Sequence, residues 1–120
     1  MLSCLSTAAA ADLSKSEVSD ALGTIKRVAD NVAAGKYTSK AHLRGPARTI
    51  AIQWAKVEPV LIHRGYAIVE TRFANRSIVA FERNWKSPAK ARTDAKDVSH
   101  SIANLLSTRR QFASPAPSPK

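Results

Sequence analysis

The feature that most constrains the fold is one amphipathic segment with a recognisable beginning and end, residues 15–34. Ser14 is followed three residues later by Glu17, which is the pattern of a helix-starting capping box. The apolar residues then recur at helical spacing: Val18, Leu22, Ile25, Val28 or Ala29, and Val32. Gly35 stands where the C-terminus of a helix favours glycine. We therefore predict a helix over 15–34 that buries one face.

The next segment, residues 36–65, fits two kinds of structure. Gly45-Pro46 interrupts it, and Pro46 suits the first position of a helix. Ile50, Trp54 and Val57 would lie on one face of a helix. Ile50, Ile52 and Trp54 also alternate as they would in a strand. The alanines between them favour a helix over residues 47–58, with a strand as the open alternative. Pro59 is expected to end or kink that helix.

Residues 66–84 alternate in the manner of a β-hairpin, with strands over Tyr66–Phe73 and Ser77–Asn84 and a loop at 74–76. A three-residue loop gathers the larger apolar side chains on one face, which is then expected to be core: Val69, Phe73, Val79 and Phe81. A two-residue loop would instead pair Val69 with Glu82, so the three-residue register is preferred.

The C-terminal third predicts a further helix that begins near Ser87-Pro88. Its apolar stripe comprises Val98, Ile102, Leu105 and Leu106. Residues 113–120 alternate proline with small residues and are expected to be a disordered tail, and residues 1–12 a flexible N-terminus. The predicted fold class is α+β: an N-terminal amphipathic helix, a short helical region, a central antiparallel β-hairpin and a C-terminal helix. These form one domain over residues 13–112.

Positive charge is concentrated in the middle of the chain. Residues 36–92 hold twelve Lys and Arg against three Glu, which accounts for +9 of the net charge of +10. The flanking residues 1–35 carry a net charge of −1 and residues 93–120 a net charge of +2. A basic block of this size suits the neutralisation of phosphates, so nucleic acid is the predicted partner.

The predicted function is therefore non-catalytic binding of nucleic acid through the hairpin and a neighbouring helix. The expected contact residues are Arg44, Arg48, Lys56, Arg64, Arg72, Arg76, Arg83, Lys86, Lys90 and Arg92. DNA is preferred over RNA, because a helix with a β-ribbon suits a groove. Homodimerisation is an open alternative. A further alternative function is that of a basic structural component of a ribonucleoprotein or virion.

Other chemistry finds little support in the sequence. Gly35-Lys36 lacks the preceding glycine of a phosphate-binding loop, because position 30 is Asp30. The three histidines and the single cysteine, Cys4, show no spacing typical of metal ligands, and no cofactor or metal is expected. The opening residues lack the basic region of a signal peptide, and no apolar run is long enough for a membrane span. We therefore expect an intracellular location (cytoplasm, nucleoid or nucleus) and no membrane partner.

Two stretches resemble known families. Leu13-Ser14-Lys15 through Gly35-Lys36 resembles the second helix of the bacterial HU/IHF histone-like proteins, which implies DNA bending by basic β-arms. The segment Gly65–Arg83 resembles the hairpin of RelE/HigB-type toxins, which implies messenger-RNA cleavage as the alternative function. The predicted order of helices and hairpin is also similar to that of winged-helix DNA-binding proteins.

Overall fold

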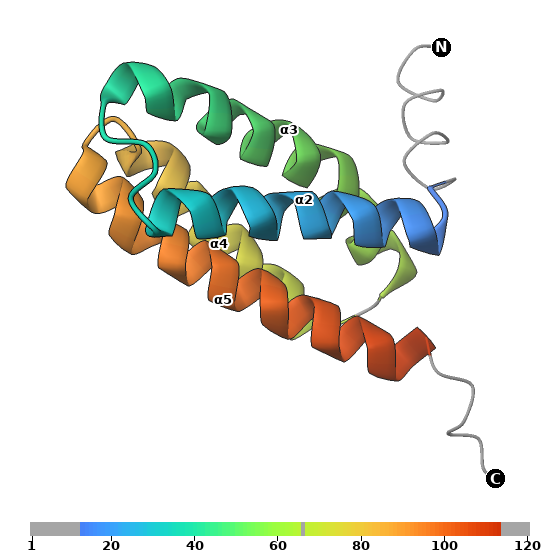
Figure 1. Cartoon of the computed structure of the whole chain (residues 1–120). Coiled ribbons are helices and arrows are strands. Elements are labelled where there is room, and N and C mark those ends of the chain that lie inside the picture. Colours follow the sequence, from blue (N-terminus) through green and yellow to red (C-terminus); the bar gives the residue numbers. More distant parts are fainter. Residues whose placement is uncertain (1–12, 66, 114–120) are drawn as a thin grey trace, which may run out of the picture.

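The computed structural model describes residues 13–65 and 67–113, and this part of the chain is all-helical (Figure 1). Its four helices are α2 (Lys15–Ala33), α3 (Lys40–Arg64), α4 (Ile68–Asn84) and α5 (Pro88–Ala113). Consecutive helices run antiparallel, and α5 returns alongside α2, so the four close into a bundle. Among the four pairs of adjacent helices, α5 packs most extensively, against both α2 and α4, and α3 packs least extensively against α4.

Helix α2 confirms the first prediction. The Ser14 side chain accepts from the Glu17 backbone N–H at 3.0 Å, and the Glu17 carboxylate accepts from the Ser14 N–H at 2.8 Å. At the other end Gly35 has φ = 81°, a left-handed conformation that a residue with a Cβ adopts at a cost. Local sequence signals therefore set both ends of this helix.

Helix α3 is longer than predicted, and it settles residues 47–58 as helix. It begins at Lys40 because the Ser39 side chain caps it, accepting from the His42 N–H at 3.2 Å, and it continues past both Pro46 and Pro59. Each proline removes one helix hydrogen bond. The carbonyls deprived of a donor belong to His42 and Ala55, two exposed residues that water can reach.

The predicted α+β class is wrong, because residues 68–84 form α4 and the described residues contain no strand. The expected loop at 74–76 lies in the middle of this helix. Three of the four residues predicted as hairpin core are exposed, namely Val69 (60%), Phe73 (54%) and Val79 (42%). Phe81 alone of the four is buried.

The physical reason is a second periodicity in the same segment. Four residues at helical spacing, Thr71, Ala74, Ile78 and Phe81, form the buried face of α4. Besides the three exposed apolar residues, the outward face carries the good helix formers Arg72, Arg76, Glu82 and Arg83. Two polar side chains of α4 also form hydrogen bonds with the neighbouring helices. The Trp54 indole N–H donates to the Asn75 side chain at 2.9 Å, and the Ser77 and Ser101 hydroxyls lie 2.9 Å apart.

Helix α5 confirms the predicted C-terminal helix and its stripe of Val98, Ile102 and Leu105. It also carries two small buried residues, Ala91 and Ala95, near its N-terminus. The helix includes Ala113, the residue at which the disordered tail was expected to begin. The expected flexible N-terminus at 1–12, Cys4 within it, and the remaining tail at 114–120 lie outside the described residues.

Candidate functional site

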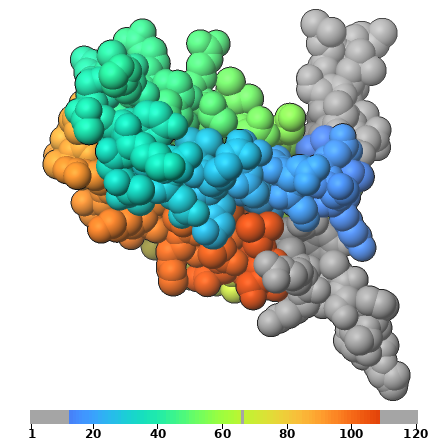
Figure 2. Space-filling view, in the orientation of Figure 1, coloured from blue at the N-terminus to red at the C-terminus, as the bar shows by residue number. Residues whose placement is uncertain are grey.

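Two chain connections meet at one end of the bundle. The α2–α3 connection and the α4–α5 connection both lie at the left of Figure 1, and their teal and orange atoms adjoin in Figure 2. A Cβ built on Gly35 would lie 3.6 Å from an Arg92 guanidinium nitrogen, so the N-terminal part of α5 packs against the α2–α3 connection. We call residues 34–48 and 83–93 together the basic end.

The basic end carries charge of one sign. It contains eight Lys and Arg residues and no Asp or Glu: Lys36, Lys40, Arg44, Arg48, Arg83, Lys86, Lys90 and Arg92. None of the eight forms an ion pair with another described residue. Positive charges placed this close repel each other, so the cluster works against folding stability and needs another explanation.

Helix termini add to the positive potential there. Both α3 and α5 begin at the basic end, and a helix N-terminus carries a partial positive charge. The C-termini of α2 and α4 lie at the same end with the opposite sign. Hydrogen bonds offset part of the negative partial charge of α2, because backbone N–H groups of residues 34–36 donate to the carbonyls of Asp30, Asn31 and Val32. The charged side chains therefore set the sign of the potential.

A shallow hollow of about 220 Å³ opens between α3 and α4 at this end. Its lining residues are Arg44, Ala47, Arg48, Ala51, Glu82 and Trp85. Trp85 packs partly against the core, and the Lys86 ammonium lies 6.0 Å from its ring centroid. Glu82 is the one carboxylate in this lining, so arginine dominates the hollow.

The structure divides the ten predicted contact residues into two groups. Six belong to the basic end: Arg44, Arg48, Arg83, Lys86, Lys90 and Arg92. The other four do not. Lys56 lines a hollow between α2 and α3 together with Glu17 and Asp20, and Arg64 donates to the Leu13 carbonyl. Arg72 and Arg76 are exposed on α4, away from both connections.

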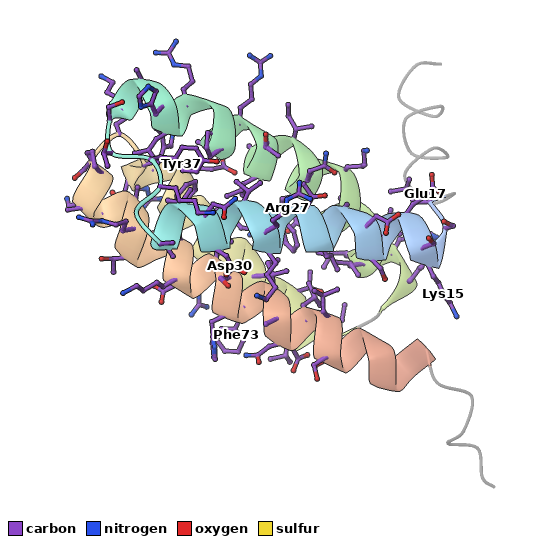
Figure 3. The ribbon with its side chains drawn as sticks, viewed as in Figure 1. Lys15, Glu17, Arg27, Asp30, Tyr37 and Phe73 are labelled. Carbon is purple, nitrogen blue, oxygen red and sulfur yellow. The ribbon has the colours of Figure 1, made fainter. Side chains whose placement is uncertain are left out.

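Sequence reasoning missed two members of the cluster, Lys36 and Lys40. Both belong to the charged block of residues 36–92, so their charge had been counted. The sequence did not show that these two lysines lie close to the start of the last helix. The bundle brings the α2–α3 connection against the start of α5, roughly 50 residues later in the chain. Tyr37, labelled in Figure 3 at this end, is partly buried against the core and anchors that connection.

The carboxylates with a shifted pKa lie elsewhere and serve the fold. Hydrogen bonds from the Ser14 backbone and side chain lower the pKa of Glu17. The pKa of Asp30 is also lowered, first by the Lys26 ammonium at 2.8 Å and then by the Ser99 hydroxyl. Since Ser99 belongs to α5, Asp30 links α2 to α5. These two carboxylates are therefore explained by capping and helix pairing.

The described residues contain no group of three or more His, Cys, Asp or Glu side chains that could hold a metal ion. Nor is any helix in this part of the chain both long and apolar enough to cross a bilayer. Comparison of the chain with protein-family models, curated proteins and solved structures found no match. The basic end is thus the feature on which a functional argument can be built.

Proposed function

We propose that this protein binds nucleic acid through the phosphates, using the basic end of the bundle. The observation that carries the proposal is the meeting of residues 34–48 and 83–93, which gathers eight cationic side chains beside a single lining carboxylate, Glu82. Each phosphate that such a surface neutralises releases counterions from the polymer, and this release favours binding.

The distribution of the charges supports a polymer as the ligand. The eight side chains come from two connections and the adjoining turns of three helices, and the hollow between Arg44 and Trp85 is shallow. A small anion would need a few donors converging on one point. A string of phosphates instead needs several cations spread along its path.

The mode of binding differs from the one predicted from sequence. Basic β-arms, a winged-helix wing and a toxin-like hairpin all require strands in this part of the chain, and residues 68–84 form α4. The preference for DNA over RNA rested on a β-ribbon entering a groove, so that reason no longer applies. The proposal is therefore for nucleic acid contacted through its backbone.

The test is the salt dependence of binding for two double variants of equal charge. Arg44→Ala with Lys86→Ala removes two cations from the basic end, and Lys15→Ala with Lys56→Ala removes two from elsewhere. Both lower the net charge from +10 to +8. Two lost phosphate contacts should reduce the slope of log K against log salt by about 1.8 on duplex DNA and about 1.4 on a single strand in the first variant. The slope of the second should stay close to that of the parent protein.

Fluorescence anisotropy with labelled single-stranded and duplex oligonucleotides over a range of salt concentrations gives these slopes. Equal losses in the two variants would mean that net charge alone drives the adsorption, and that the basic end is not a site. Absence of binding by the parent protein at low salt would end the proposal.

A further inference from the structure

A third hollow lies between α4 and α5, on the side of α4 away from α3. Its volume is about 500 Å³, which is within the usual range of small-molecule sites. Glu70 and Phe73 line it from α4, and α5 contributes His100, Ser101, Asn104, Ser107 and Thr108. One aromatic wall thus faces a row of hydroxyl, amide and imidazole groups. Such a lining suits a flat polar ring better than an aliphatic ligand.

The aromatic wall is unusually open. The side chain of Phe73 is 54% exposed, whereas Phe81 on the same helix is fully buried in the core. The Arg76 guanidinium lies 5.7 Å from its ring centroid, one helical turn further along α4. An exposed ring beside an arginine is the combination that single-stranded nucleic acids use, since bases stack on the ring and the cation accompanies the backbone.

The polar lining is available for recognition. The side chains of Glu70, His100, Asn104 and Ser107 make no hydrogen bond to another described residue. The carboxylate of Glu70 would repel a phosphate, but it can accept from the amino group of a base. The hollow is therefore suited to a nucleobase, with the phosphates on the arginines outside it.

The arginines of α4 connect this hollow to the basic end. Arg72, Arg76 and Arg83 are all exposed on α4, and the helical rise places Arg72 about 16 Å from Arg83 along the axis. Arg83 itself belongs to the basic end. A strand whose phosphates lie on the basic end can follow these side chains to Phe73. Duplex bases are already stacked and paired, so only an unpaired base can use the ring.

Resting on the proposed function, we infer that the α4–α5 hollow takes an unpaired nucleobase, which stacks on Phe73 while Arg72 and Arg76 contact the adjoining phosphates. The inference names single-stranded nucleic acid as the ligand class. It also gives a role to two arginines that lie away from the basic end.

The test compares Phe73→Ala with two matched variants on a short single-stranded oligonucleotide and on the same sequence as a duplex. Loss of one stacked base corresponds to a roughly 5- to 150-fold weaker affinity. We expect a loss in that range for the single strand and none for the duplex. Phe73→Tyr keeps the ring, and Val69→Ala trims an equally exposed apolar neighbour that does not line the hollow. Both should bind like the parent.

Failure of the inference can be told from failure of the proposed function. If the parent binds with the expected salt slope but Phe73→Ala changes nothing, the hollow takes no base and the basic end remains a site. Equal losses for Phe73→Ala and Val69→Ala, or for single strand and duplex, would also overturn the inference. Thermal melts of each variant confirm that these exposed substitutions leave the fold intact.

Discussion

The two ends of the bundle use charge in opposite ways. At the basic end, residues 34–48 and 83–93 hold eight cations that form no ion pair among the described residues, and Glu82 is the one carboxylate in the hollow there. At the opposite end, residues 13–20 and 58–70 hold four carboxylates and two Lys or Arg residues. Figure 3 labels Lys15 and Glu17 there, far from Tyr37. Cations thus predominate at the basic end, whereas these two segments of the opposite end carry both signs of charge.

The partners of these side chains explain the difference. At the opposite end Glu17 completes the capping box of α2, and Arg64 at the end of α3 donates to the Leu13 carbonyl. These polar groups hold the ends of helices in place. No basic-end cation forms an ion pair or caps a helix among the described residues, although Arg92 packs beside Gly35 and Lys86 lies near the Trp85 ring. Their charges are therefore the better candidates for a ligand. A charged side chain is a better indicator of a binding site when it forms no ion pair or cap within the fold.

Disrupting α4, which connects the two ends, should have the greatest effect on stability. Ala74→Pro should cost 3 kcal/mol or more of unfolding free energy, because residue 74 is fully buried in mid-helix. In a hairpin this position would lie in the loop, where proline is readily accommodated. Urea unfolding measures the loss, and Arg76→Ala on the exposed face is the control, expected within about 0.5 kcal/mol. A stable Ala74→Pro variant would contradict the helix.

Alanine substitutions at the two ends should differ in how much they lower the unfolding free energy. Arg64→Ala should destabilise the protein by roughly 1.5–3 kcal/mol, because it removes a charged donor from the Leu13 carbonyl. Lys86→Ala at the basic end should leave the unfolding free energy within about 0.5 kcal/mol of the parent value. Chemical denaturation of both variants makes the comparison. Similar losses in the two would show that the basic end is also structural.

The smallest effect concerns pH. The pKa of Asp30 is lowered in the folded protein, chiefly by Lys26, so its contribution to stability is present above its ordinary value of 3.8. That contribution is lost as pH falls below this value and through the lowered pKa. Asp30→Asn should therefore flatten the acid side of the stability profile. The measurement is the thermal midpoint from neutral pH down to pH ~2–3.

Asp97→Asn is the matched control on α5, since Asp97 is exposed and has no partner among the described residues. Its profile should follow that of the parent protein. An Asp30→Asn profile with the full acid loss would show that Lys26 and Ser99 do not stabilise the charged carboxylate in solution.

Predictability from sequence followed the strength of local signals. Helix α2 was predicted almost to the residue, because Ser14, Glu17 and Gly35 fix its ends through short-range hydrogen bonds and backbone conformation. The proline rules misled for α3, where Pro46 and Pro59 occur within one continuous helix. The site was predicted in part. Arg44, Lys86 and Arg92 fall in the basic end, whereas Arg64 is engaged by Leu13 and Lys36 was overlooked.

Three features follow from the amino-acid sequence without any tertiary contact: the capped first helix, the apolar stripe of the last helix and the concentration of positive charge in the middle of the chain. The tertiary structure decided whether residues 68–84 would be helix or hairpin, because Val69, Phe73 and Val79 suit an alternating strand while Thr71, Ala74, Ile78 and Phe81 suit a helix. Burial against α3 and α5 selects the second set. That choice places Phe73 at the surface and brings two distant connections together. A one-dimensional charge pattern becomes a site only when packing fixes which charges are neighbours.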